Sequence, residues 1–242
     1  MAATKETVLV VGATGNIGTS AVIGALNSGR DVLAIVRNQA SAEKLFHNVG
    51  TREGITTVEA DVLADDGVQG VVDQVRAGKL PSFQHVYSTA GGVYSETPLS
   101  EIATKDLRVA MTQNFESNFF AYRATFPYLK SLGAPASFTL CTGSQGNIGA
   151  RALPAMTQGA LFSLANAASR ETAGSGVRFV EVYLDLRVEV DESAARTGAA
   201  RASDFAGVYE EVLRRGEIEG ARVWVASKED FRGFKWEKKV KL

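Results

Sequence analysis

The sequence predicts a single-domain α/β fold in which a doubly wound, mostly parallel sheet of about seven strands lies between helices. Three observations lead to this prediction. Short β-branched and apolar runs alternate with helical segments along the chain. A glycine-rich turn directly follows the first of these runs. No Pro- or Ser-rich linker divides residues 1–242, and with 45% hydrophobic content the chain can bury one complete core.

The predicted strands are apolar runs of the kind that is buried on both faces of a parallel sheet. In chain order they are Thr7–Val11, Asp31–Val36, Ile55–Glu59, His85–Thr89, Ser137–Thr142, Val177–Leu184 and Arg222–Ala226. The helices predicted between them are Thr19–Ser28, Asp66–Ala77, Thr104–Leu132, Ala155–Thr172 and Ser203–Arg215. We expect Pro127 to kink or divide the third helix, and Ser203 to cap the last one.

The glycine-rich turn, Gly12-Ala13-Thr14-Gly15-Asn16-Ile17-Gly18, lies between the first predicted strand and the first predicted helix. Glycine has no Cβ, so it permits a tight turn and lets backbone N–H groups approach a pyrophosphate. The helix N-terminus adds partial positive charge there. This placement predicts a nucleotide site of the Rossmann type, and a merely structural turn is the alternative. The residues expected to bind the cofactor here are Gly12, Thr14, Gly15, Asn16, Ile17 and Gly18.

The ends of the next two strands indicate which nucleotide is bound. An acidic residue after the second strand would bind a ribose 2′-hydroxyl, whereas an arginine suits a 2′-phosphate. Arg37 and Asn38 follow that strand, so NADP(H) is favoured over NAD(H), unless Arg37 is only a solvated loop charge. Asp61 and Val62 follow the third strand. Asp61 could accept a hydrogen bond from the adenine amino group, or it could cap the following helix.

Composition excludes several classes of partner. The formal net charge is −1 and no basic stripe is present, so nucleic acid is not expected. The single cysteine, Cys141, excludes a disulfide framework and fits a reducing compartment, and no Cys/His cluster predicts a metal site. Without an apolar N-terminal segment or a membrane-spanning run, we expect a cytoplasmic protein with no membrane partner. We interpret the basic stretch Lys235–Leu242 as a frayed, solvated tail.

The order of these elements resembles that of the short-chain dehydrogenase/reductase family over nearly the whole chain. Besides the glycine turn and Asp61-Val62, the stretch Ser88-Thr89-Ala90-Gly91 stands where typical members carry Asn-Asn-Ala-Gly. Asn114 has the spacing of the family's helix-borne active-site Asn. The resemblance implies a small-molecule substrate, a homodimer or homotetramer, and a catalytic or structural role for Asn114. It also implies cofactor contacts from Thr89, Ala90 and Gly91.

The family's proton-donating Tyr and its Lys are absent from the positions where the resemblance would place them. If Gly146 matches the family's glycine, Gly143 stands at the Ser position, Met156 at the Tyr position and Ala160 at the Lys position. Neither this register nor one shifted by a residue supplies a phenol or an amine, so Tyr-driven alcohol dehydrogenation is not expected. The shifted register places Ser144 at the Ser position, Thr157 at the Tyr position and Leu161 at the Lys position.

Other polar residues at the carboxyl ends of the strands are candidates for catalysis. Asp185 follows an apolar run, so partial burial could suit it to acid–base work; pairing with Arg187 or capping the next turn is the alternative. Ser144 could hydrogen-bond a substrate carbonyl or only the loop backbone. Tyr94 and Tyr183 could be substitute proton donors or packing residues.

Two loops are expected to border the substrate pocket. The segment Gly143–Gly149 repeats the glycine spacing of the first turn, but Pro154 separates it from the next helix. We therefore expect a flexible pocket wall there rather than a second phosphate site. The small, charged segment Asp191–Arg201 is expected to be a mobile flap or a short helix over the site.

Three functions stay open at this point. The first is an atypical NADP(H)-dependent reductase of a C=N, C=O or activated C=C group in specialised metabolism, with a proton from Asp185, a tyrosine or water. The second is a non-redox cyclase, isomerase or dehydratase on the same scaffold, and the third is an NADP(H)-binding regulatory pseudoenzyme. We favour the first, because an imine or activated enone needs less help from an acid than a ketone does.

Overall fold

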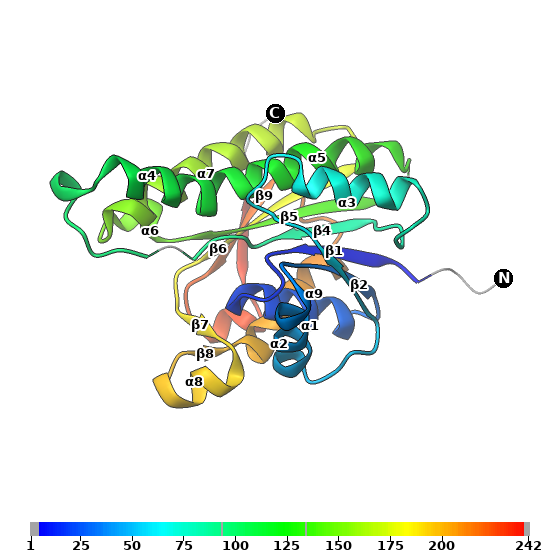
Figure 1. Cartoon of the computed structure of the whole chain (residues 1–242), viewed down its shortest axis with the longest axis horizontal. Helices are drawn as coiled ribbons and strands as arrows, with labels where there is room; N and C mark the ends of the chain where they lie inside the picture. The colour runs from blue at the N-terminus through cyan, green and yellow to red at the C-terminus, as the bar shows by residue number, and fades with distance from the viewer. Residues whose placement is uncertain (1–4, 93, 134, 240–242) are drawn as a thin grey trace.

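A twisted sheet of eight strands lies between two layers of helices (Figure 1). The computed structural model describes residues 5–92, 94–133 and 135–239. All strands are parallel except the last, which runs antiparallel to its neighbour. From one edge to the other they are β10 (Lys235–Lys238), β9 (Ala221–Val225), β6 (Val177–Leu184), β5 (Ala136–Gly143), β4 (His85–Ser88), β1 (Thr7–Val11), β2 (Asp31–Val36) and β3 (Ile55–Glu59). The predicted fold class is confirmed, with eight strands in place of about seven.

The helices fall close to the predicted ranges, with two exceptions. They are α1 (Asn16–Asn27), α2 (Gln39–Val49), α3 (Gly67–Arg76), α4 (Thr104–Met111), α5 (Ser117–Ser131), α6 (Gln145–Ile148), α7 (Ala152–Glu171), α8 (Asp191–Thr197) and α9 (Ala202–Arg214). Helices α2 and α6 are absent from the prediction. Pro127 does not divide the predicted helix Thr104–Leu132, because it lies inside α5; the division falls at the π-helical turn Thr112–Glu116 between α4 and α5.

The remaining elements are short. They are the 3₁₀ turns Leu99–Glu101 and Glu229–Phe231 and the strands β7 (Val188–Glu189) and β8 (Ala200–Arg201). Strands β7 and β8 pair with each other in a separate parallel ribbon. The predicted cap at Ser203 is also wrong, because α9 begins at Ala202 and the Ser203 backbone and hydroxyl both donate to the Asp191 carboxylate.

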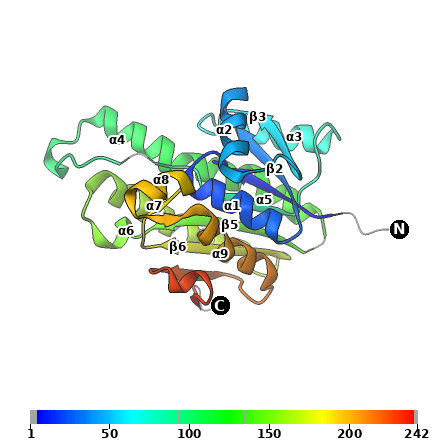
Figure 2. The same cartoon turned by 90° about the horizontal axis from the view of Figure 1, so that it is seen from below.

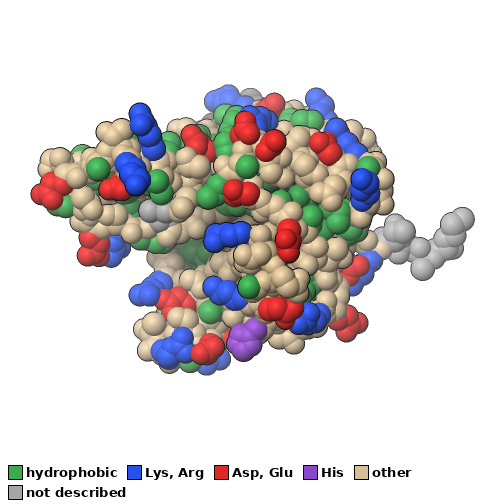
Figure 3. Space-filling view, viewed as in Figure 1, with side chains coloured by type: hydrophobic (Ala, Val, Ile, Leu, Met, Phe, Trp, Pro, Cys, Tyr) green, Lys and Arg blue, Asp and Glu red, His purple; other side chains and the backbone are tan. Residues whose placement is uncertain are grey.

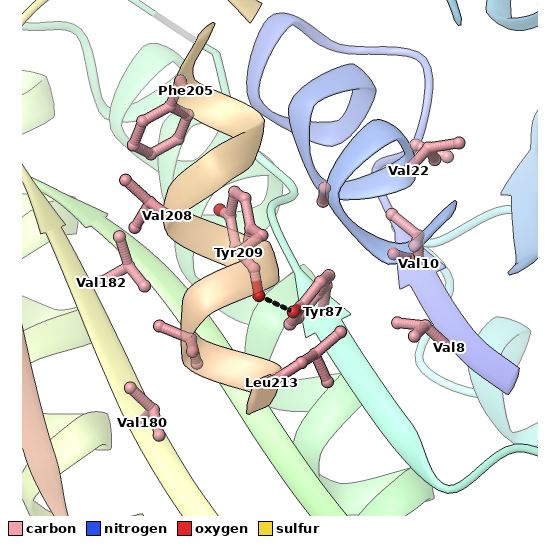
Figure 4. Packing of buried hydrophobic residues seen from close by; sticks show 14 of the residues in the cluster. Val8, Val10, Val22, Tyr87, Val180, Val182, Phe205, Val208, Tyr209 and Leu213 are labelled. Atoms are coloured by element: carbon pink, nitrogen blue, oxygen red, sulfur yellow. Dashed lines mark hydrogen bonds between the residues drawn. The ribbon is translucent and has the colours of Figure 1, made fainter. Parts of the chain in front are cut away.

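The core has two halves, one on each face of the sheet. Helices α1, α2 and α9 cover one face, and α3, α5 and α7 cover the other (Figure 1). Figure 4 shows the first half, where valines from β1 and β6 meet Phe205, Val208 and Tyr209 of α9. The hydroxyl of Tyr87 donates to the Tyr209 carbonyl oxygen at 2.6 Å, which satisfies a polar group deep in this apolar layer.

The C-terminal stretch is part of the sheet, so the prediction of a frayed tail is wrong for the described residues up to Lys239. Strand β10 pairs with β9, and the Lys239 ammonium binds the Glu181 carboxylate. Glu181 is fully buried. Its carboxylate also accepts hydrogen bonds from the Nε and Nη2 atoms of Arg222, each at 3.0 Å, and from the Thr142 hydroxyl at 2.7 Å. Basic side chains on an edge strand resemble a solvated tail in sequence, since they face water. Residues 240–242 of the predicted tail lie outside the described residues.

No helix among the described residues is long and apolar enough to cross a bilayer.

Candidate cofactor and active site

The first glycine turn joins β1 to α1, and its glycines have different roles. A Cβ on Gly12 would lie 2.9 Å from the Ala90 nitrogen, and a Cβ on Gly18 would lie 2.0 Å from the Gly12 oxygen. These two positions need glycine because other backbone segments press against them. A Cβ on Gly15 would have only the Gly12 oxygen within 4 Å, at 3.5 Å. Gly15 therefore borders open space.

The N-terminus of α1 presents unused amides beside that open space. The first hydrogen bond within the helix runs from the Thr19 nitrogen to the Gly15 oxygen at 2.8 Å. The N–H groups of Asn16, Ile17 and Gly18 precede it, so they are available to an anion at the positive end of the helix dipole. The Asn16 side chain is occupied differently, since its Oδ1 accepts from the Val190 nitrogen at 3.1 Å.

The residues predicted to select the nucleotide lie at the ends of β2 and β3. These strands pair through Val36 and Glu59, so Arg37 and Asp61 emerge at the same edge of the sheet, and both are exposed. The Asn38 side chain caps α2 by accepting from the Ser41 nitrogen at 2.9 Å, which gives it a structural role. Asp61 accepts from the Leu63 nitrogen at 2.9 Å. It does not cap α3, whose N-cap position is Asp66. Val62 is half-buried next to it.

The predicted cofactor residues after β4 lie against the glycine turn. The Thr89 nitrogen and hydroxyl both donate to the Val11 oxygen at 3.0 Å, which fixes the end of β4 beside the end of β1. Ala90 follows and abuts Gly12, and its oxygen accepts from Asn118 at 2.8 Å. Gly91 has a φ of 150°, a conformation that suits glycine. The structure thus brings the stretch Thr89–Gly91 and the turn Gly12–Gly18 together.

Asn114 lies buried in the π-helical turn, where it joins two segments of the site. Its Oδ1 accepts from the Gly92 nitrogen at 3.0 Å, and its Nδ2 donates to the Thr157 hydroxyl at 3.3 Å. The Asn114 backbone oxygen accepts from Asn118 at 2.9 Å. Among the contacts that the structure describes, Asn114 joins the loop after β4 to α7.

The structure separates the two registers considered for the reaction centre. Gly143 ends β5, where it pairs with Leu184 of β6. Met156 is 37% exposed and Ala160 is half-buried, whereas the side chains of the shifted register point into the core. Those side chains, Thr157 and Leu161, are 0% and 1% exposed. The first register therefore places its two residues on the exposed side of α7, and the shifted register places them in the core.

The expected flexible wall contains a helical turn. Helix α6 lies within Gly143–Gly149 and packs on α7, because a Cβ on Gly146 would lie 2.4 Å from the Phe162 ring. Pro154 does not separate this segment from the helix, which corrects the prediction: it lies in the first turn of α7, where a missing N–H breaks no helical hydrogen bond.

Two of the proposed catalytic residues do not have the environment expected of them. Asp185 is exposed rather than partly buried, and Arg187 pairs with Glu189 instead of Asp185. Tyr183 is 4% exposed, its ring packs 4.6 Å from that of Trp224, and its hydroxyl accepts from Asn147 at 3.2 Å. Tyr183 is therefore a packing residue.

Tyr94 and Ser144 lie at the open edge of the site. Tyr94 belongs to the segment after β4, which the ion pair of Arg151 with Glu96 at 2.9 Å links to the start of α7. Desolvation by the surrounding protein raises the pKa of the Tyr94 hydroxyl, although 72% of the residue is exposed, and the Arg151 charge lowers it. The net effect keeps the phenol protonated near neutral pH. Ser144 is half-buried at the N-cap of α6, and its nitrogen donates to the Leu184 oxygen at 3.0 Å.

The segment Asp191–Arg201 forms a short helix, α8, as one of its two interpretations predicts. Figure 2 shows α8 beside α1, and the hydrogen bond from Val190 to Asn16 joins the two regions. In Figure 3 the surface is indented between the protruding α4 region and the α8 region. The carboxyl ends of the central strands point toward this side of the molecule, which is where ligands bind in open α/β sheets.

The sequence places Gln158 among the polar residues expected at the carboxyl ends of the strands but gives it no catalytic role, and the structure brings it into contact with Gly143. Its Oε1 accepts a hydrogen bond from the Gly143 nitrogen at 2.6 Å. The sequence contains a signal for this contact. Gln158 is only two residues from Met156, and Gly143 has no side chain to fill the space beside β5. Among the described residues, no group of three or more His, Cys, Asp or Glu side chains could hold a metal ion.

Comparison with known proteins agrees with this geometry. A model of the short chain dehydrogenase family matches residues 6–186. The short-chain dehydrogenase/reductase iacG of Pestalotiopsis fici is 52% identical over 240 residues, which cover 97% of each chain. A short-chain type dehydrogenase/reductase from Mycobacterium ulcerans has a TM-score of 0.77 at 18% identity, covering 95% of this chain and 92% of its own. ElxO with NADP bound has a TM-score of 0.72 at 18% identity, covering 85% and 90%. The chain belongs to the short-chain dehydrogenase/reductase family.

Proposed function

We propose that the protein is an NADP(H)-dependent reductase that acts on a C=N, C=O or activated C=C group of a small molecule in specialised metabolism. The observation that carries the proposal is the cradle at the start of α1. Gly15 borders open space, the amides of Asn16–Gly18 face an anion site, and Arg37 is exposed at the neighbouring strand end. This set fits a dinucleotide with a 2′-phosphate. The fold shared with ElxO, whose structure holds NADP, supports the same cofactor.

The residues that would hold the cofactor follow from this fit. The amides of Asn16–Gly18 would bind the pyrophosphate, and Arg37 would bind the 2′-phosphate. Asp61 has one carboxylate oxygen engaged by Leu63, and the other could accept from the adenine amino group. The stretch Thr89–Gly91 would line the path toward the reaction centre. When bound, NADPH supplies a hydride and becomes NADP⁺.

The proton would come from a source other than the family's Tyr. Met156 and Ala160 stand on the open face of α7, and neither side chain can give or hold a proton. Tyr94 is the remaining phenol at the open edge, and because burial raises the pKa of its hydroxyl it would be a weaker acid than an ordinary tyrosine. Water is the other source. A substrate whose carbon is already electrophilic enough to accept the hydride would react without a strong acid.

A non-redox isomerase or dehydratase is the second candidate function, and the same two positions favour it. Met156 and Ala160 stand where the family has the Tyr and Lys of its proton relay, so the relay is missing while the glycine turn for the cofactor is kept. In such an enzyme the dinucleotide would form part of the pocket wall and contribute to the electrostatic potential in the pocket.

A turnover assay separates these functions. The purified protein is incubated with NADPH and a panel of cyclic imines, enones and ketones, while the absorbance of the reduced nicotinamide and the products are followed. A reductase consumes NADPH in proportion to reduced product. Product that forms while NADPH stays constant would favour the isomerase class. Binding of NADPH without any product across the panel would favour a regulatory protein.

A further inference from the structure

The side-chain amide of Gln158 lies beside the position where the family resemblance places a Ser. Its Oε1 accepts from the Gly143 nitrogen at 2.6 Å. A Cβ on Gly143 would lie 3.5 Å from the Gln158 Cδ and 3.6 Å from its Oε1. A serine hydroxyl at position 143 would therefore be in contact with this amide. Because Gly143 has no side chain, the Gln158 amide can pack against it and accept its N–H.

The hydrogen bond to Gly143 fixes how the amide is oriented. Because Oε1 faces the Gly143 nitrogen, Nε2 lies on the other side of Cδ, and its two hydrogens point away from that nitrogen within the amide plane. No hydrogen bond among the residues that the structure describes uses those two hydrogens. Gln158 is half-buried and Gly143 ends β5 at the carboxyl edge of the sheet, so a ligand in that crevice can approach them. An amide donates at any ordinary pH, since it does not titrate.

We propose that Gln158 binds the substrate oxygen, with Nε2 donating a hydrogen bond to a carbonyl. This inference deepens the proposed reductase function and depends on the same crevice. As a hydride from NADPH adds to the carbonyl carbon, or to the far carbon of an enone, the electron pair of the C=O bond moves to oxygen. The amide stabilises that charge, and a proton from water or Tyr94 then neutralises it.

The same geometry narrows the substrate class. A carbonyl or enone oxygen accepts a hydrogen bond from Nε2, whereas a protonated imine is itself a donor and has no lone pair to offer. Gln158 therefore favours a ketone, an aldehyde or a carbonyl-conjugated C=C over an iminium ion. Gln158→Glu would keep an acceptor for the Gly143 nitrogen, lose the donor and add a negative charge, whereas Gln158→Leu removes the donor without adding charge.

The test measures the bound carbonyl directly and does not need turnover. Cyclohex-2-enone labelled with ¹³C at its carbonyl is titrated into the NADP⁺-loaded protein and observed by NMR. Hydrogen bonding to Nε2 moves the carbonyl resonance downfield, and Gln158→Glu and Gln158→Leu abolish the shift. The matched control is Gln69→Leu on α3, where the amide donates to Asp73 at 2.8 Å, and this variant keeps the shift. An unchanged shift in Gln158→Glu, or no shift in the wild type at the highest soluble concentration, overturns the inference.

Kinetics distinguish this inference from the proposed function. If the wild type reduces an enone, Gln158→Glu lowers kcat by about 10²–10³-fold, the usual effect of losing one oxyanion donor, and changes KM much less. Reduction that proceeds at the wild-type rate in this variant contradicts the role of Gln158 but not the reductase function. A shift that depends on Gln158 in a protein that never oxidises NADPH supports the oxygen site and rejects the reductase.

Discussion

Replacing Gly15 with alanine should separate cofactor binding from folding. Gly15 is the N-cap of α1 with φ −79° and ψ 172°, a conformation that alanine adopts without strain. Its Cβ would have the Gly12 oxygen at 3.5 Å as its nearest neighbour, which is an ordinary contact distance. The new methyl group would then occupy the space where we place the pyrophosphate.

The expected magnitudes differ widely between the two properties. Stability changes by less than about 1 kcal/mol, because the reduced freedom of the unfolded chain and the weaker N-cap nearly offset each other. Binding loses at least one charge-assisted hydrogen bond between a backbone amide and a phosphate. Such a bond contributes about 1.5–3 kcal/mol, so the Kd for NADPH should rise roughly 10- to 150-fold.

The assay is NADPH fluorescence on titration with protein, together with urea unfolding of the same samples. Gly70→Ala is the matched control, because Gly70 lies in the exposed part of α3 with no atom within 4 Å of its Cβ. It should gain up to about 1 kcal/mol of stability and bind NADPH as the wild type does. An unchanged Kd in Gly15→Ala, within about twofold, would refute the placement of the pyrophosphate.

Three further changes test other parts of the account. Arg37→Ala should weaken NADPH roughly tenfold and leave NADH unchanged, and equal losses for both would reject the 2′-phosphate contact. Burial lowers the pKa of His85 to about 4, below its unfolded value of 6.5, so the folded state keeps it neutral. Stability should therefore fall by about 2 kcal/mol between pH 7 and pH 5 in urea titrations, and a slope that persists in His85→Gln would contradict this. Lys239→Met leaves the buried Glu181 with Arg222 and the Thr142 hydroxyl, and should destabilise the protein by about 2 kcal/mol in urea unfolding; no loss would show that β10 contributes little.

The strands were predictable because their signal is local. A strand buried on both faces is a continuous apolar run, and the predicted bounds of Thr7–Val11 and Val177–Leu184 agree with the structure. Helix α2 carries cap residues at both ends, Asn38 and Gly50, but only two of its residues are buried, so its apolar pattern is weak. Strand β10 depends on pairing with β9 and on a salt bridge to Glu181, neither of which a local pattern contains.

The cofactor residues were more predictable than the catalytic ones for a related reason. The glycine turn is contiguous in sequence, and the structure shows that Gly12 and Gly18 are fixed by backbone contacts. The reaction centre joins residues from distant segments. Whether Asp185 is buried, or whether Gln158 reaches Gly143, depends on how α7 and the strand ends pack. Spacing alone left two registers open, Met156 with Ala160 or Thr157 with Leu161, and only the folded structure shows that the second pair is buried.

The most direct test of the central claim is the affinity of the wild-type protein for NADPH. A fluorescence titration, repeated with NADH, should show saturable binding with NADPH bound more tightly, and the Kd for NADPH should rise at least roughly tenfold in Gly15→Ala while the fold persists. No saturable binding of either dinucleotide by folded protein would contradict the account.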